Sequence, residues 1–388
     1  MLVIAQWYTD TPLPPEKKPM TSTPYTETYQ ADASEQRNRR RGLAGRLKRL
    51  ISIYDPRIWK EKGLWWTAGV LIATAAVAVI GLGIYWSRSP APFDVQENAL
   101  AMVGNDKQKL VTGSYTTAAV IRIGETLLDK PGGYLTNDVT PPGVYLDNIP
   151  NWEFGALMAL RDVAESMRND LSRSQSQSVA DEDLQVAHPQ FNYDSDSWIL
   201  PSTESEYRKG LAAMKSYFNR LSDEKETDAQ FYARADNLSD YLGKVSKRLG
   251  NFGNRLAYAV GQTTYDSSRV GEPGARQSTP VPEQTQKKTP WLKLDDVFFQ
   301  ARGYTWAVLE ILEAMKVDFA SVIADKTAGV PLRQVLDQLR DTQEPLRSPI
   351  ILNGTGFGIF DNHSLVMASY ISRANAGIIN LRELLQRG

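Results

Sequence analysis

Two glycine-rich segments hold the side chains best suited to binding a ligand. In residues 129–155 the candidate ligand-binding side chains are aromatic rings and carboxylates, namely Tyr134, Asp138, Tyr145, Asp147 and Trp152. Residues 353–364 add Phe357, Asp361 and His363. Ligand sites are concave and combine aromatic or apolar walls with a few polar groups. If the two segments meet, these eight residues form a cleft for a sugar-like or peptide ligand.

A structural role for the same residues is the alternative. Asp147–Asn148 and Asp361–Asn362 each stand just before a predicted helix. There a side-chain oxygen can accept a hydrogen bond from a free backbone N–H group and cap the helix. The aromatic rings would then pack beneath the loops. Both interpretations stay open, and the observation that separates them is whether the two segments face one cavity.

The residue inventory limits the chemistry. The chain has no cysteine, which excludes disulfides, thiolate nucleophiles and iron–sulfur ligation. Its only histidines are His188 and His363, and no other grouping indicates a nucleophile. The glycines at 354, 356 and 358 lack both the spacing and the βαβ unit of a dinucleotide site. We therefore predict no metal and no cofactor, and a non-enzymatic role ahead of an enzymatic one.

An uncharged apolar run extends from Leu64 to Trp86. A helix that crosses a bilayer needs about 20 apolar residues at 1.5 Å each, so one span fits. Aromatic rings stand at both ends of the run, where they prefer the headgroup level. A cleaved signal peptide fits poorly, because the run is too long and begins after sixty residues. The sequence predicts a transmembrane helix at 64–86.

Charge beside this run predicts its orientation. Residues 36–63 carry ten basic residues against two acidic ones, whereas Arg88 stands alone on the far side. The positive-inside rule therefore places the N-terminus in the cytoplasm and residues 87–388 in the periplasm of a bacterium, with the span in the inner membrane. The basic segment 36–63 is expected to contact anionic lipid headgroups. The mildly acidic remainder argues against nucleic acid as a partner.

The segment before the basic residues is expected to be disordered. Residues 1–35 are rich in Thr, Pro, Ser and Glu and show no sustained period. The opening residues 1–10, MLVIAQWYTD, are unusually apolar for such a tail, and Met20 begins a more ordinary polar leader, so Met20 is an alternative to Met1 as the start. We predict a disordered cytoplasmic tail over 1–35.

Beyond the span, apolar residues recur at spacings of three and four, which place them on one face of a helix. Five clear stripes lie within 157–171, 207–221, 231–252, 301–322 and 367–385, and two weaker ones within 110–128 and 331–340. The polar stretch 176–202 has no such stripe, and its His188 is expected to be solvated. The predicted fold is all-α: one transmembrane helix followed by a periplasmic bundle of six to eight helices.

One long segment divides the helical part. Residues 263–290 are rich in Pro, Gly, Ser and Thr and have no apolar period, which indicates a flexible linker or loop. It separates a helical region at 87–262 from a C-terminal region at 291–388. The second region has too few predicted helices to bury its own wide apolar faces, so we expect it to pack on the first.

Four motifs carry a resemblance: YDPRIWKEKG before the span, PGGYLTND and PPGVYLDN after it, and FGIFDNHS near the end. With them, most of residues 50–388 resembles a proteobacterial inner-membrane family known only as domain of unknown function 2333. The resemblance implies the topology and a role in the cell envelope. It implies no activity and no site residues.

Two functions remain as hypotheses. The first is a non-enzymatic envelope scaffold, or a component that binds another envelope protein. The second is binding or processing of peptidoglycan or a lipid-linked ligand through the loops 129–155 and 353–364.

Overall fold

The computed structural model describes residues 52, 54–174, 179–223, 228–265, 284–348, 350–355 and 359–387. The tail 1–35, residues 36–51 of the basic segment and residues 266–283 of the predicted linker lie outside the described residues. The chain divides into two units, Met1–Val77 and Ala78–Gly388, and each is considered by itself.

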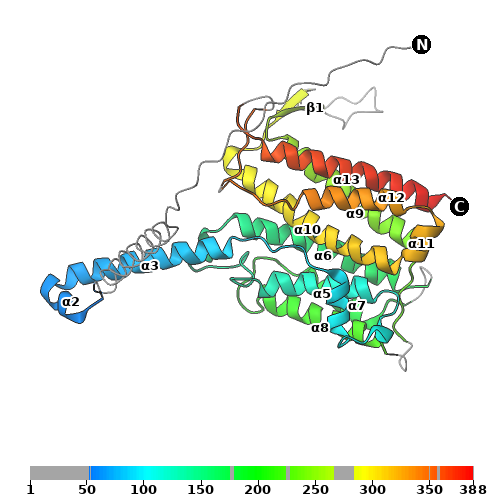
Figure 1. Ribbon diagram of the computed structural model, residues 1–388, viewed down its shortest axis with the longest axis horizontal. Coiled ribbons are helices and arrows are strands. Elements are labelled where there is room, and N and C mark those ends of the chain that lie inside the picture. Colours follow the sequence, from blue (N-terminus) through cyan, green and yellow to red (C-terminus); the bar gives the residue numbers. More distant parts are fainter. Residues whose placement is uncertain are drawn as a thin grey trace, which may run out of the picture. The chain divides into compact units, whose positions relative to one another are not determined.

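The described elements are almost all helices, so the predicted all-α class is confirmed (Figure 1). In chain order they are α2 (Pro56–Lys62), α3 (Leu64–Trp86), α4 (Val95–Met102), η1 (Lys107–Lys109), α5 (Ser114–Asp129), η2 (Gly143–Tyr145), α6 (Asn148–Ser166), the π-helical turn η3 (Met167–Leu171), α7 (Glu182–Phe191), α8 (Thr203–Leu221), α9 (Ala235–Ala257), β1 (Gln262–Tyr265), β2 (Gln284–Lys287), η4 (Trp291–Lys293), α10 (Leu294–Asp318), α11 (Ala320–Asp325), α12 (Gly329–Asp341) and α13 (His363–Gln386).

The first unit holds α2 and the beginning of α3. Asp55 caps α2 by accepting a hydrogen bond from the backbone N–H of Arg57 at 2.9 Å. Gly63, with φ of 82°, joins α2 to α3 in a conformation that other residues adopt only with strain. The hydroxyls of Tyr54 and Thr74 lie 2.5 Å apart, so the segment before α2 contacts α3.

Helix α3 is, among the described residues, the one helix long and apolar enough to cross a membrane. Its bounds are those predicted from the apolar run. Only Gly83 of its 23 residues is buried. A helix that is apolar on every side but not covered by protein differs from the core helix of a soluble domain.

The second unit stacks its helices in three layers (Figure 1). Helices α9, α12 and α13 form one outer layer, and α5, α7 and α8 form the other. Between them lie α6 and α10, which make the most extensive helix pair in the molecule. One hydrophobic core runs through all three layers. Helix α10, from the segment after 290, therefore packs directly on α6, from the segment before 263.

Two glycines set how closely α6 and α10 approach. A Cβ atom on Gly155 would overlap the carbonyl oxygen of Gln300, and one on Gly303 would overlap that of Trp152. The two backbones are thus in direct contact. Around this crossing Trp152 and Trp306 are both fully buried, with ring centroids 5.0 Å apart.

The predicted stripes correspond to the seven long helices of the domain, with differences at particular ends. Helix α9 begins at Ala235 because Phe231, counted in its stripe, lies in extended chain and packs on Phe319 at 5.9 Å. The polar stretch 176–202 contains α7, with Leu184, Ala187 and Phe191 buried. His188 is half-buried there rather than solvated, because Arg168 and the helix cover it.

The ends of the predicted linker pair with each other. Strands β1 and β2 form an antiparallel ladder in which Gln262 faces Lys287 and Tyr265 faces Gln284. Thr289 N donates a hydrogen bond to the carbonyl of Tyr258 at 3.0 Å, which fixes the base of this hairpin to the end of α9.

Candidate functional site

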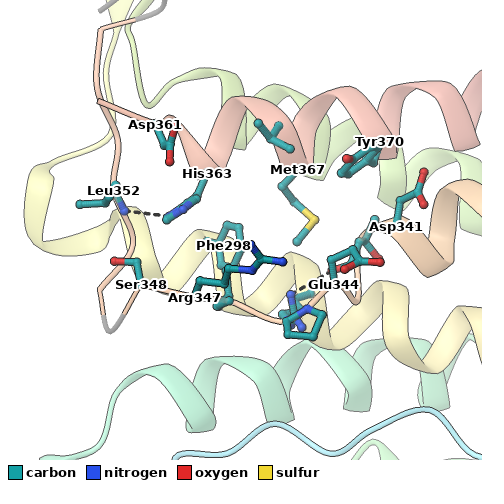
Figure 2. A pocket seen from close by; sticks show the side chains of 15 residues that line it. Phe298, Asp341, Glu344, Arg347, Ser348, Leu352, Asp361, His363, Met367 and Tyr370 are labelled. Carbon is teal, nitrogen blue, oxygen red and sulfur yellow. Dashed lines mark hydrogen bonds between the residues drawn. The ribbon is translucent and has the colours of Figure 1, made fainter. Parts of the chain in front are cut away.

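The candidate site is a pocket of about 490 Å³ between α10, α13 and the chain that joins α12 to α13 (Figure 2). That volume lies within the range of small-molecule sites. The side chains that line it are Phe298, Arg302, Asp341, Thr342, Glu344, Pro345, Leu346, Arg347, Ser348, Leu352, Asp361, His363, Val366, Met367 and Tyr370.

Helix capping fixes the wall at the start of α13. Asn362 accepts a hydrogen bond from Leu365 N through Oδ1 at 2.9 Å, and its Nδ2 donates to the carbonyl of Gly354 at 2.5 Å. Asn353 Oδ1 accepts from Ser364 N at 3.2 Å. These bonds hold the connecting chain against the first turn of α13.

His363 is oriented by the same connection. Its Nδ1 accepts a hydrogen bond from Leu352 N at 2.9 Å, drawn as a dashed line in Figure 2. A nitrogen that accepts carries no proton, so the proton of the neutral ring is on Nε2. The ring lies 6.4 Å from that of Phe298 on α10.

Arg302 places a positive charge in the floor of the pocket. It is buried, and it donates to the carbonyls of Thr342 at 3.1 Å and Gln343 at 2.9 Å. Burial lowers the pKa of Arg302 to about 10, against the opposing effect of Glu344, so the guanidinium stays charged at neutral pH. No carboxylate in the described part of the chain forms an ion pair with it.

The open side of the pocket carries charges of both signs. Arg347 is exposed and extends into the pocket beside Phe298 (Figure 2), and it makes no ion pair with any described residue. Asp341, Glu344 and Asp361 line the same opening. Phe298, Val366 and Met367 supply apolar walls. The described residues contain no group of three or more His, Asp or Glu side chains that could hold a metal ion.

Glu153 organises the first glycine-rich loop. Glu153 is fully buried and forms an ion pair with Lys130, which is also buried. Its carboxylate accepts from Leu135 N at 2.9 Å, Thr136 N at 2.8 Å and Thr136 Oγ1 at 2.5 Å. These bonds tie the PGGYLTND motif to α6.

The predicted site residues of this loop have separate surroundings. Trp152 is fully buried against Trp306, so it is a core residue and offers no ring face to a ligand. Tyr134 is buried too and donates to the carbonyl of Ser195 at 3.0 Å. Asp147 caps α6 by accepting from Asn148 N at 2.8 Å. Asp138 is half-buried, and burial raises the pKa of its carboxyl. Tyr145 is exposed.

The two predicted loops lie on different sides of α10. Asn151 of α6 donates to Asp296 at 2.9 Å, whereas His363 lies against Phe298. The pocket includes Asp361 and His363 and no residue of 129–155. Phe357 lies outside the described residues. The cap of α13 is Asn362, not Asp361, whose side chain is exposed.

Sequence reasoning missed Phe298, Arg302, Arg347 and Tyr370, which come from three separate elements. One signal was available for Arg302. It is a charged residue within the predominantly apolar segment 297–315, and such a residue is seldom buried without a reason.

Comparison with known proteins bears on the family alone. No curated protein and no solved structure matches the chain. The model of the family described as uncharacterized protein conserved in bacteria (DUF2333) matches residues 59–388, which include the end of α2, α3 and the whole helical domain. The chain therefore belongs to this family of bacterial proteins of uncharacterized function.

Proposed function

We propose that this protein is a non-enzymatic, membrane-anchored component of the bacterial envelope that binds a peptide segment of another envelope protein. Helix α3 crosses the inner membrane, the basic residues before it remain in the cytoplasm on anionic lipid, and the helical domain faces the periplasm. The uncharged length of α3 and the ten basic residues in 36–63 support this arrangement.

The pocket beside α13 carries the binding proposal. Its apolar walls suit a side chain of the bound segment, and its charges suit the ends or side chains of a peptide. Neither Arg302 nor Arg347 forms an ion pair with a carboxylate among the described residues, so an incoming carboxylate would find two cations. A charge-assisted bond of that kind is among the stronger polar contacts.

The experiment places a photo-crosslinking amino acid at Tyr370, inside the pocket, in the full-length protein in cells. Ile379, on the same helix and exposed, is the matched control position. We expect a discrete protein adduct from position 370 and not from 379. Val366→Trp, which narrows the pocket from an exposed position, should abolish the adduct, whereas Ile379→Trp should not.

Other outcomes have definite meanings. Equal adducts from both positions, or an adduct unaffected by Val366→Trp, would contradict binding in the pocket. Adducts to peptidoglycan fragments in place of a protein would favour the second hypothesis, because stem peptides also present carboxylates.

A further inference from the structure

Exposed aromatic side chains gather at one end of the helical domain. Among the described residues from 87 onward they are Tyr145 at 76% exposure, Trp198 at 57%, Trp291 at 77% and Phe360 at 73%. All four lie in connections at the end where α6, α10 and α13 begin (Figure 1). The exposed large apolar residues elsewhere on the domain are aliphatic and scattered, such as Val179 and Val330.

The last turn of α3 packs at this same end. A Cβ atom on Gly83 would meet Pro142 at 3.6 Å and Leu146 at 3.7 Å, so the loop around η2 lies against α3 there. Trp86 lies so close to Gly132 that an added Cβ would come within 2.8 Å of its ring. The loop 131–146 thus surrounds the point where α3 joins the domain.

The contact at Gly83 indicates how far the loop 131–146 reaches along α3. Gly83 precedes the end of the apolar run by three residues, which is about 4.5 Å at 1.5 Å per residue. Val144 and Tyr145 lie between the two residues that touch Gly83, and both are exposed. They therefore lie near the level of the last turn of α3, before the apolar run ends. Interfacial side chains of peripheral helices enter the bilayer to about 5–10 Å.

One further loop is tied to this one, and another is tied to the first turn of α6. Asn137 Nδ2 donates to the carbonyl of Ser197 at 2.9 Å, which brings Trp198 and the 91%-exposed Leu200 beside it. The Asn151–Asp296 bond holds the start of α10, and Trp291 and Leu292 directly precede that helix. Both are exposed, at 77% and 81%.

From this arrangement we infer a lipid-contacting surface, made by Val144, Tyr145, Trp198, Leu200 and Trp291, that enters the outer headgroup layer of the membrane crossed by α3. The inference rests on the span in the proposed function. Its consequence is a domain held against the bilayer in a fixed orientation rather than suspended from a flexible tether.

Apolar insertion, not charge, is the source of this contact. The carboxylates of Asp138, Asp147 and Asp296 outnumber Lys288 and Lys293, the basic residues that flank Trp291, so the charges of these segments would not attract anionic lipid. Tyr and Trp are the side chains that favour the membrane–water boundary. The contact should therefore form equally in a zwitterionic bilayer.

The absence of cysteine allows a direct test. Single variants Val144→Cys, Trp198→Cys and Val330→Cys of the full-length protein are labelled with a fluorophore and reconstituted in phosphatidylcholine vesicles. Lipids that carry a nitroxide near the headgroup serve as the quencher. Labels at 144 and 198 should lose fluorescence, whereas a label at 330, exposed at the start of α12, should not. Partial replacement by phosphatidylglycerol should not increase the loss.

A label at Val77→Cys, in the middle of α3, reports the span separately with a deep nitroxide lipid. Failure at 77 would refute the span and, with it, the proposed function. Quenching at 77 without quenching at 144 and 198 would refute the lipid-contacting surface alone. Labels at 144 and 198 shielded from both lipid and aqueous quenchers would indicate a second protein copy on this surface and would also contradict the inference.

Discussion

At the scale of single residues, the helical domain contains a buried carboxyl group that affects its stability. Glu310, in the middle of α10, is 1% exposed and accepts a hydrogen bond from Phe93 N at 3.2 Å. Burial raises the pKa of Glu310 from 4.5 to about 8, so the carboxyl is protonated at neutral pH. Phe93 belongs to the segment between α3 and α4, so this carboxyl holds the start of the domain onto its central helix.

The raised pKa predicts a pH-dependent stability. Between pH 4.5 and 8 the unfolded carboxyl has lost its proton and the folded one has not. The free energy of unfolding therefore falls as the pH rises through this range. Glu310→Gln, which cannot ionise, should gain stability over the wild type as the pH rises. Urea unfolding of the full-length protein in detergent at about pH 5 and about pH 9 measures the free energy of unfolding of the wild type and of the variant. If the difference between these two free energies is the same at both pH values, the buried carboxyl is not protonated as described.

The Asp361–Asn362 pair gives a second prediction at this scale. Of this pair Asn362 alone caps α13, so Asn362→Ala should lower the free energy of unfolding by about 1 kcal/mol. The neighbouring Asp361→Ala serves as the matched control and should change it by less than about 0.5 kcal/mol. If Asp361 serves the pocket instead, its variant should lose the Tyr370 adduct at unchanged stability. Equal destabilisation by both variants would contradict the assignment of Asn362 as the cap of α13.

At the scale of elements, the closest helix crossing is the most sensitive point. Gly303→Ala would force α10 away from Trp152 of α6, and overpacking of this kind costs about 3 kcal/mol or more where backbone must move. Gly250→Ala, on α9, meets only Asn375 at 3.7 Å and should stabilise by up to about 1 kcal/mol, because alanine favours the helix. Urea unfolding of both variants checks the contrast. Similar stabilities for the two would mean that α6 and α10 do not touch at Gly303.

Elements were the most predictable level from sequence. A stripe such as Tyr207–Leu221 identifies α8 because burial on one face repeats with the helix period. Helix α7 was not predicted, because it has only three buried positions among polar residues and contains Pro189. Helix α9 began later than its stripe because Phe231 is buried from an extended segment, and burial alone does not reveal backbone conformation.

The candidate site was less predictable for a related reason. His363 and Asp361 follow from a local motif, whereas Phe298, Arg302 and Arg347 join them only through tertiary packing. Trp152 illustrates the reverse case. Its place between glycine-rich chain and a helix suggested a ligand, but Gly303 leaves room for the backbone of Trp152 and the ring packs in the core on Trp306. The packing of Trp152 against Gly303 joins two segments far apart in the sequence, so no local motif predicts it.

At the scale of the whole molecule, the proposed arrangement is one membrane span between a basic segment and a layered helical domain. Every other proposal depends on it, since a pocket for a periplasmic partner needs the domain outside. The family match includes α3 and the domain together, at residues 59–388.

The most direct test compares two fusions of a reporter that is active only in the periplasm. Fused after Gly388, the reporter should be active, because the proposed orientation has the ten basic residues of 36–63 on the cytoplasmic side. Fused after Lys62, before the span, it should be inactive. Inactivity after Gly388 together with activity after Lys62 would reverse the orientation, and equal activity at both sites would contradict the single membrane span itself.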